Sequence, residues 1–338
     1  MVTMRDVAQR AGVSIATVSF VLNDTKPVTP ATRAKIERAM TELGFRRNMV
    51  ARALASRRTR IIAMAYPALD HRFGFSAAEF FTSAADAARK QDYHLVLWPV
   101  GNDGAELTEL VGQSLVDGVV LMEVQLDDAR VGILQSIGTP FALIGRTTTP
   151  DGLPHVDIDF ETTVENAVGE LYGLGHRQIV LVAGDLSHPS FRNYGPYVRS
   201  EAAYRRVAAE YGVQTVIIES SDTTRSGQEV AARVMAEHPN TTAVLVVNEY
   251  AALGVVSGLK KLGHDVPREI SVLALLMSSE TARLADPELT IMRTPGPELG
   301  QLGTEALIRQ LEGADPLPPQ LVPAAYQPGG TTALPRSG

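Results

Sequence analysis

The N-terminal fold follows from residues 3–23, which read TMRDVAQRAGVSIATVSFVLN. Thr3 and Asp6 have the spacing of a capping box at the start of a helix, with Asp where Glu or Gln is usual. Gly12 ends that helix after apolar residues at helical spacing, and Ser14 caps the next one. Two helices of about two turns each, joined by a turn that contains glycine, form a helix-turn-helix.

A third helix is expected to begin at Thr29-Pro30, an N-cap followed by proline, and to stop at Gly44.

In a helix-turn-helix the second helix enters the major groove of DNA. Four of its residues point away from the apolar stripe or lie at its edge: Ala16, Thr17, Ser19 and Phe20. Small side chains allow close approach, and hydroxyl groups bond phosphates or base edges. A three-helix bundle with no nucleic-acid role is the alternative.

Charge is distributed unevenly along the 338 residues, whose formal net charge is −7. Residues 1–60 hold ten Arg and two Lys against two Asp and two Glu, a net charge of +8. The totals of 31 basic and 38 acidic residues leave 19 and 34 for the remainder, a net charge of −15. A small basic head on an acidic body favours a phosphate-binding module on a separate scaffold, and it disfavours the bundle without a nucleic-acid role.

Composition excludes several classes of protein. The chain contains no cysteine, which rules out disulfides and thiolate metal sites. We see no signal peptide and no apolar run near the roughly 18–20 residues of a membrane span. No metal-ligand spacing, nucleophile motif or phosphate-binding glycine loop is present. We therefore expect a cytoplasmic, nucleoid-associated protein that is not an enzyme, binds no cofactor or metal and has no membrane partner.

Residues 48–57 are rich in alanine but too short to form a stable helix alone in water. With this segment included, residues 4–60 resemble the DNA-binding head of the lactose-repressor (LacI/GalR) family. The resemblance rests on many positions in register: residues 5–8, 11–14, 17–19, 21–23, 32–33, 43–45, 48 and 51–54. It is far more specific than a single motif.

This resemblance implies that residues 48–57 form a hinge helix when two protomers meet on an operator. Leu54 would then enter the minor groove beside its symmetry mate and kink the duplex. The expected DNA-contacting residues combine both parts of the head: Thr3, Ser14, Ile15, Ala16, Thr17, Ser19, Phe20, Asn23, Thr29, Arg33, Asn48, Ala51, Arg52, Leu54 and Ala55. The expected partner is therefore an operator in double-stranded DNA, bound by a homodimer.

Two positions depart from the family pattern. The family often has Arg where Phe20 stands, and Phe cannot donate a hydrogen bond to guanine. Phe20 would pack on a thymine methyl group or lie partly buried against the first helix, and we favour a changed operator sequence. Arg47 stands where the family commonly has Pro, which loosens the entry to the hinge and adds a phosphate contact.

From residue 60 onward, apolar strands alternate with helical stretches. Strands are expected at 61–66, 94–99, 118–122, 141–144, 155–158, 179–183, 215–218, 243–247 and 271–276. Helices are expected at 76–90, 104–115, 161–174, 198–211, 226–236 and 250–262. This alternation predicts parallel sheets covered on both faces, and the number of strands suits two sheets better than one. The fold class is thus an all-α head followed by an α/β body.

The body also resembles the lactose-repressor family, whose fold is that of type I periplasmic binding proteins with two doubly wound parallel-sheet subdomains. The matches are residues 117–119, 173–176, 179, 248–249, 252–254, 266–267, 270–272 and 287–290. The resemblance implies three crossings between subdomains, near residues 159, 288 and 320, and an effector in the cleft. The expected domains are a head (1–47), a hinge and linker (48–60) and a body (61–338), divided into an N-subdomain (61–158, 288–319) and a C-subdomain (159–287, 320–338).

Loops at the strand ends supply the candidate effector contacts. Arg and carboxylate groups beside an aromatic ring would suit a sugar. We expect contacts from Phe73, Phe75, Arg146, Arg192, Arg199, Asn248, Glu249 and Leu276. The family's sugar-binding members usually have an Asp pair where Leu276-Met277 stands, and the aromatic residues that often stack on the sugar are missing near residues 221–222 and 296. The alternatives are a sugar bound through other contacts, a larger, less polar or different ligand, and no ligand at all.

The leading interpretation is a dimeric repressor of a pseudo-palindromic operator. A solute-binding protein for uptake is the second hypothesis, and the basic head counts against it. The third is an activator or a corepressor-dependent regulator with the same architecture. No leucine heptads follow residue 315, so no tetramerising coiled coil is expected. The Gly, Pro and Thr residues after 326 are expected to form a loose tail.

Overall fold

The computed structural model describes residues 2–23, 26–45, 58–67, 74–113, 115–188 and 191–336. The chain divides into two compact units, Met1–Thr59 and Arg60–Gly338. Their boundary falls within the linker that we predicted at 48–60. Among the described residues, no helix combines the length and the apolar character needed to cross a membrane.

The head consists of α1 (Met4–Ala11), α2 (Ile15–Asn23) and α3 (Pro30–Leu43). The backbone N–H of Thr3 donates to Asp6 Oδ2 at 2.8 Å, and both halves of the predicted capping box are present. Thr29 caps α3, and Gly44 ends it in the left-handed conformation. The three helices share a buried core to which each contributes: Val7, Ala8, Val18, Val21, Leu22, Ile36 and Ala39. The predicted hinge at 48–57 lies outside the described residues.

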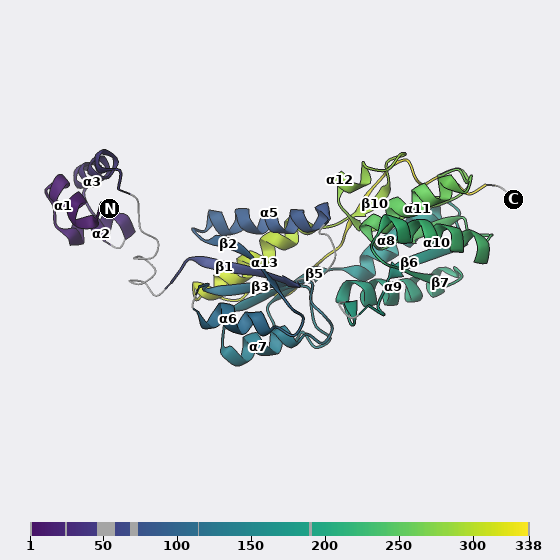
Figure 1. Cartoon of the computed structure of the whole chain (residues 1–338), viewed down its shortest axis with the longest axis horizontal. Helices are drawn as coiled ribbons and strands as arrows, with labels where there is room; N and C mark the ends of the chain where they lie inside the picture. The colour runs from purple at the N-terminus through teal and green to yellow at the C-terminus, as the bar shows by residue number, and fades with distance from the viewer. Residues whose placement is uncertain are drawn as a thin grey trace. The chain divides into compact units, whose positions relative to one another are not determined.

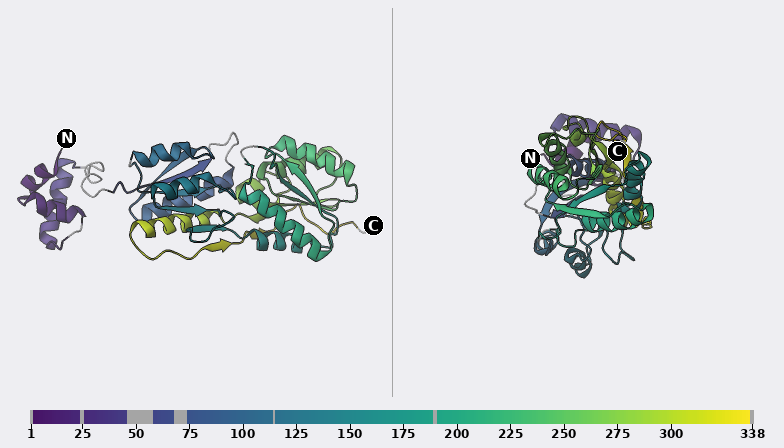
Figure 2. Two further views of the ribbon diagram at one scale, coloured as in Figure 1. Left: turned by 90° about the horizontal axis from the view of Figure 1, so that it is seen from below. Right: turned by 90° about the vertical axis from the view of Figure 1, so that its right-hand side faces the viewer.

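The body forms two lobes, each built on one six-stranded sheet (Figure 1, Figure 2). The first sheet has the order β11-β5-β4-β3-β1-β2 and is parallel throughout. Its strands are β1 (Ile61–Pro67), β2 (His94–Val100), β3 (Gly118–Met122), β4 (Phe141–Ile144), β5 (His155–Ile158) and β11 (Gln320–Val322). Helices cover both faces, which is why strands such as β3 are apolar at every position.

Two pairs of helices cover the two faces of the first sheet. One face of the first sheet packs against α5 (Phe75–Lys90) and α13 (Gly296–Leu311). The other face packs against α6 (Ala105–Gly112) and α7 (Ala129–Ile137). Gly300 belongs to the contact between α5 and α13, because a Cβ there would lie 2.5 Å from the carbonyl oxygen of Phe80.

The second sheet has the order β12-β10-β9-β8-β6-β7. Its strands are β6 (Ile179–Gly184), β7 (Val216–Ser220), β8 (Ala243–Val246), β9 (Ser271–Met277), β10 (Thr290–Arg293) and β12 (Ala325–Gln327), and β12 runs antiparallel to β10. The helices α8 (Phe160–Gly173) and α9 (Gly195–Tyr211) cover one face. The helices α10 (Thr224–Glu237) and α11 (Glu249–Lys261) cover the other, beside the short α12 (Ser279–Ala282).

The chain crosses between the lobes after β5, after β10 and after β11. The first crossing lies at the predicted residue 159. The other two fall a few residues later than the predicted 288 and 320, because β10 belongs to the second sheet and β11 to the first. Neither β10 nor β11 was among the strands expected from the sequence, which is why these boundaries were misplaced.

The prediction of a loose tail after residue 326 is wrong. Thr331 is fully buried, and its backbone carbonyl accepts a hydrogen bond from Val272 N at 2.8 Å. Its hydroxyl donates to the Val272 carbonyl at 2.6 Å and accepts from Thr290 N at 2.8 Å. The imidazole of His176 lies 2.9 Å from the Ala333 carbonyl. The C-terminal segment is therefore bonded to the amino ends of β9 and β10 in the second lobe.

Replacing Thr331 with Val tests this attachment. The variant keeps the shape of the side chain but removes the partner of two buried main-chain groups. We expect Thr331→Val to lower the free energy of unfolding by about 1–3 kcal/mol, measured by urea denaturation. Thr215→Val, at an exposed position, is the control and should change it little. An unchanged midpoint in Thr331→Val would contradict the packing described here.

Candidate functional site

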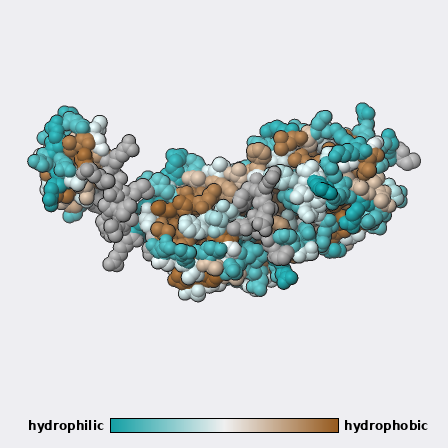
Figure 3. Space-filling model, in the orientation of Figure 1, coloured by the Kyte–Doolittle hydropathy of each residue, from teal (hydrophilic) through white to brown (hydrophobic). Residues whose placement is uncertain are grey.

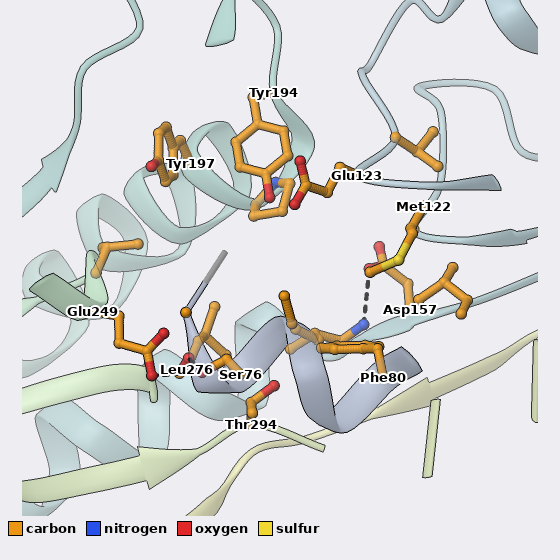
Figure 4. A pocket seen from close by; sticks show the side chains of 18 of the residues that line it. Ser76, Phe80, Met122, Glu123, Asp157, Tyr194, Tyr197, Glu249, Leu276 and Thr294 are labelled. Atoms are coloured by element: carbon orange, nitrogen blue, oxygen red, sulfur yellow. Dashed lines mark hydrogen bonds between the residues drawn. The ribbon is translucent and has the colours of Figure 1, made fainter. Parts of the chain in front are cut away.

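A cavity of about 190 Å³ lies between the two lobes (Figure 4). Its walls come from the carboxyl ends of β3, β5, β8 and β9 and from the first turns of α5, α9 and α11. In open α/β sheets this is the edge at which ligands bind. The cavity therefore has the position expected of a small-molecule site.

Asp157 of β5 is an almost fully buried carboxylate in the wall of the first lobe. Its Oδ2 lies 3.6 Å from Arg146 Nε and 3.9 Å from Arg199 Nη1, and Oδ1 accepts from Ile158 N at 2.8 Å. Arg199 comes from α9 of the second lobe, and its Nη2 donates to the Arg146 carbonyl at 2.8 Å. Burial raises the pKa of Asp157 to about 6, although both arginines oppose the shift.

Glu123 follows β3 and lines the cavity with a left-handed backbone, at a φ of 53°. Arg130 holds this turn in place: its Nη2 donates to the Glu123 carbonyl at 2.9 Å. The same guanidinium forms two hydrogen bonds with Asp128, at 2.9 and 2.7 Å, in a pair of fully buried side chains. Burial raises the pKa of Glu123 to about 7, against the opposing charge of Arg130.

Three aromatic rings form a cluster in the wall of the second lobe. Ring centroids lie 5.6 Å apart for Phe191 and Tyr194, 5.3 Å for Phe191 and Tyr197, and 4.9 Å for Tyr194 and Tyr197. All three rings line the cavity, and Figure 4 shows the two tyrosines on one side with Phe80 of α5 on the other. Burial, and then the charge of Glu123, raise the pKa of Tyr194 well above its ordinary value.

Glu249, the first residue of α11, reaches across the cavity to the first lobe. It accepts from Ser76 Oγ of α5 at 3.0 Å and from Ser278 Oγ at 3.1 Å. Asp222 accepts from Tyr250 N at 2.8 Å at the start of the same helix. Burial raises the pKa of Asp222 to about 6, although its hydrogen bonds to backbone N–H groups lower it.

The head exposes both polar and apolar side chains at the start of α2. Ser14, Ile15 and Ala16 are exposed, and Ser14 Oγ accepts from Thr17 N at 3.1 Å. Phe20 is half-buried, with Lys26 Nζ 5.0 Å from its ring centroid. Thr3 and Thr29 are exposed helix caps, whereas Ser19 and Arg33 are half-buried. Asn23 is the last residue of α2. The predicted DNA contacts of the hinge lie outside the described residues: Asn48, Ala51, Arg52, Leu54 and Ala55.

Comparison with known proteins gives a consistent result for both units. Residues 3–48 match the model of bacterial regulatory proteins of the lacI family, and residues 168–332 match a periplasmic binding protein-like domain. Catabolite control protein A of Priestia megaterium is 29% identical over 316 residues, which is 92% of either chain. The chain belongs to the LacI family. It is a transcriptional regulator with a helix-turn-helix head and a periplasmic-binding-type body, as the sequence predicted.

Two solved structures of the LacI family show the same fold. The lac repressor dimer bound to operator and an anti-inducer is 26% identical, with a TM-score of 0.82, and the match covers 98% of this chain and 99% of that one. The transcriptional regulator CelR in complex with cellobiose is 25% identical, with a TM-score of 0.71, over 98% of this chain and 100% of the other. Both cover the head and the body.

The structure brings half of the predicted effector residues to the cavity of this LacI-family chain. Arg199, Asn248, Glu249 and Leu276 line it, and Arg146 lies behind Asp157. Phe75 and Arg192 are exposed and are not among the lining residues, while Phe73 lies outside the described residues. Leu276 faces the cavity with a φ of 54°, and Met277 is fully buried in the second lobe.

The other lining residues were not predicted from the sequence, and they include Phe80, Glu123, Asp157, Tyr194, Tyr197 and Asp222. Two of these residues, Asp157 and Glu123, could have been recognised from the sequence. Asp157 stands between Val156 and Ile158 in a strand that is buried at every position, and a carboxylate in such a place needs partners. Glu123 directly follows a fully apolar strand at its carboxyl end. The tyrosines begin a helix from a different loop, and no local pattern links them to the strand ends.

Replacing Glu123 with Gln tests its burial. Because the pKa of Glu123 is raised to about 7, its contribution to stability is complete below its unfolded value of 4.5 and is lost as the pH rises through 7. Gln does not ionise. We therefore expect Glu123→Gln to be more stable than the wild type at about pH 8, by roughly 1–3 kcal/mol, and the difference to shrink towards about pH 5. Thermal denaturation checks this.

The matched control is Glu219→Gln, an exposed position in the same body. It removes the same charge without changing the cavity. A stability difference for Glu123→Gln that is the same at both pH values would contradict the raised pKa.

Proposed function

We propose that this chain is a dimeric repressor that binds a pseudo-palindromic operator, with an operator affinity set by a small molecule in the cavity between the lobes. The observation that carries the proposal is the combination of an exposed helix-turn-helix face with a cavity between the lobes at the strand ends. The helix-turn-helix face supplies contacts to DNA, and the cavity supplies a binding site for the small molecule.

The DNA contacts follow from the exposed part of α2 and from the hinge. Ser14 and Thr17 offer hydroxyl groups to phosphates or base edges, and Ile15 and Ala16 offer apolar contacts to the major groove. The net charge of +8 in residues 1–60 supports binding to the phosphate backbone. Leu54 would enter the minor groove, as expected from the resemblance. The similar lac repressor dimer was solved in complex with an operator, which supports the same partner here.

Dimerisation is proposed through the first lobe. Strand β2 is the edge of its sheet, and Leu97 on it is 46% exposed. Figure 3 shows hydrophobic surface gathered on this lobe where β1 and β2 lie. An exposed apolar edge invites a partner. Two protomers joined there would place two hinge segments on one operator, since a single Leu54 would open the minor groove poorly.

Control by a small molecule follows from the position of the cavity. Its walls come from both lobes, so a ligand that binds better to one arrangement of the lobes shifts the population towards it. Whether the ligand releases the operator or strengthens binding depends on which arrangement it prefers. The similar regulator CelR was solved in complex with cellobiose, which supports a small hydroxylated molecule as the class.

Titration of DNA from upstream of the protein's own gene tests the proposal. Full-length protein should bind tightly, and its affinity should fall steeply as the salt concentration rises. Residues 60–338, which keep both sheet cores, should not bind. Leu54→Ala should weaken binding by about tenfold or more because it removes the wedge that stabilises the kinked minor groove.

The control is Leu334→Ala, which removes an apolar side chain that is 70% exposed at the far end of the chain. It should leave the affinity unchanged. Equal binding by full-length protein and by residues 60–338 would refute DNA recognition by the head.

A further inference from the structure

Arg60 is the first residue of the body, and it has a left-handed backbone with a φ of 59°. Residues other than glycine rarely adopt this conformation, so the surrounding structure has to hold it. Two main-chain hydrogen bonds do so: Arg60 N donates to Asp117 Oδ2 at 2.9 Å, and the Arg60 carbonyl accepts from His94 N at 2.8 Å. The chain is therefore fixed at the residue where the linker ends.

The side chain of Arg60 is held as well. Its Cζ lies 4.8 Å from the centroid of the Tyr93 ring, and its Nη1 lies 3.0 Å from Glu312 Oε1. The almost fully buried Tyr93 donates from its hydroxyl to the same oxygen at 2.8 Å. One carboxylate oxygen thus joins the arginine to the tyrosine. We call Arg60, Tyr93, Asp117 and Glu312 the linker clamp.

Stability alone is a poor reason for this arrangement. The side chains of Arg60 and Glu312 are 27% and 40% exposed, and ion pairs open to water stabilise a fold only slightly. The left-handed backbone of Arg60 is itself unfavourable. A strained residue that is held in place at a junction between two units is typical of a positioning role.

Helix α13 connects the linker clamp to the second lobe. Glu312 is the C-cap of α13, whose 16 residues span roughly 24 Å. At the other end only Thr294 and Pro295 separate α13 from β10 of the second lobe, and Thr294 N donates to the Met277 carbonyl at 3.2 Å. Thr294 and Leu299 also line the cavity. One helix therefore contacts the cavity at its start and the clamp at its end.

Helix α5 runs beside α13 in the first lobe (Figure 1). Its first turn is bonded to the second lobe, because Ser76 Oγ donates to Glu249 Oε1 at 3.0 Å. Its last turn is bonded to the clamp, because Tyr93 N donates to the Ala88 carbonyl at 2.9 Å. The two helices pack closely at Gly300, so a displacement of one shifts the other.

We propose that the linker clamp is a positioning device for DNA binding: it sets the direction in which the linker leaves the body, and α13 and α5 transmit a change in the arrangement of the lobes to it. This inference rests on the proposed function, because it assigns the route by which the cavity controls the operator affinity. An effector in the cavity would act by moving Glu312 relative to Arg60.

Three substitutions open the clamp with three different changes of charge. Arg60→Gln removes a positive charge, Glu312→Gln removes a negative charge, and Tyr93→Phe removes a hydroxyl group only. If charge near the DNA were all that mattered, Arg60→Gln would weaken operator binding, Glu312→Gln would strengthen it and Tyr93→Phe would leave it unchanged. Opening the clamp should instead weaken binding in all three.

We expect a loss of about fivefold or more in each single variant, and no further loss when Arg60→Gln and Glu312→Gln are combined, because both remove the same interaction. The affinity is measured with full-length protein and DNA from upstream of its own gene. Circular dichroism first establishes that every variant is folded, and Tyr93→Phe is the least disruptive of the three.

A second measurement shows whether the clamp responds to the lobes. Gln125 and Tyr194 pair across the rim of the cavity, so a disulfide between Gln125→Cys and Tyr194→Cys holds the lobes in the arrangement of this structure. With the clamp intact, the oxidised and reduced proteins should differ in operator affinity by about tenfold or more. Adding Tyr93→Phe or Glu312→Gln should reduce this ratio to about twofold or less. A merely structural role of the clamp would leave the ratio unchanged.

The matched controls come from the exposed ion pair of Arg233 and Glu237 on α10. Arg233→Gln and Glu237→Gln remove the same charges as the two clamp variants. Both should leave the operator affinity and the oxidised-to-reduced ratio as they are.

Opposite effects of Arg60→Gln and Glu312→Gln on operator affinity would overturn the inference. So would a ratio that survives both Tyr93→Phe and Glu312→Gln, or equal affinities of the oxidised and reduced proteins with the clamp intact. In each of these cases the protein still binds its operator, and DNA recognition by the head stands. A failure of the unaltered protein to bind any operator would refute the repressor proposal, and this inference with it.

Discussion

Two short stretches of main chain, one from each lobe, pair across the rim of the cavity. Gln125 and Tyr194 form an antiparallel bridge, flanked by a hydrogen bond from Leu126 N to the Asn193 carbonyl at 2.7 Å. Gly195 N donates to the Val124 carbonyl at 3.3 Å. A Cβ at Gly195 would lie 2.9 Å from that carbonyl oxygen, so the close approach of the two lobes requires glycine. The separation of the cavity walls depends on this pairing.

The cavity walls also carry unfavourable local structure. Glu123 and Leu276 both adopt a left-handed backbone, which is unusual for residues other than glycine. Both face the cavity at the end of a strand, one in each lobe. The buried Arg130–Asp128 pair fixes the first of these turns. Strain and buried charge are retained where they position groups for a ligand, and apolar packing on both sheet faces offsets them.

Local signals allowed much of the fold to be predicted. The caps at Thr3, Thr29 and Gly44 and the apolar strands of both sheets depend on neighbouring residues, so the sequence displays them. The strands β10 and β11 were not predicted, and their assignment to a lobe depends on contacts with distant parts of the chain. The packing of Thr331 against β9 is likewise a tertiary property. Asn248 and Glu249 could be predicted because they directly follow a strand, whereas Tyr194 reaches the cavity only through the pairing of the lobes.

If the arrangement of the lobes sets the affinity for DNA, a disulfide across the rim tests this without knowledge of the ligand. In an antiparallel bridge such as that of Gln125 and Tyr194, the two Cα atoms lie about 4.5 Å apart. This separation is within the range found in disulfides. The chain has no cysteine, so Gln125→Cys with Tyr194→Cys creates a single reversible crosslink. Operator affinity is measured for the oxidised and the reduced double variant. We predict a difference of about tenfold or more, corresponding to roughly 1.4 kcal/mol, and equal affinities would contradict control of DNA binding by the lobes.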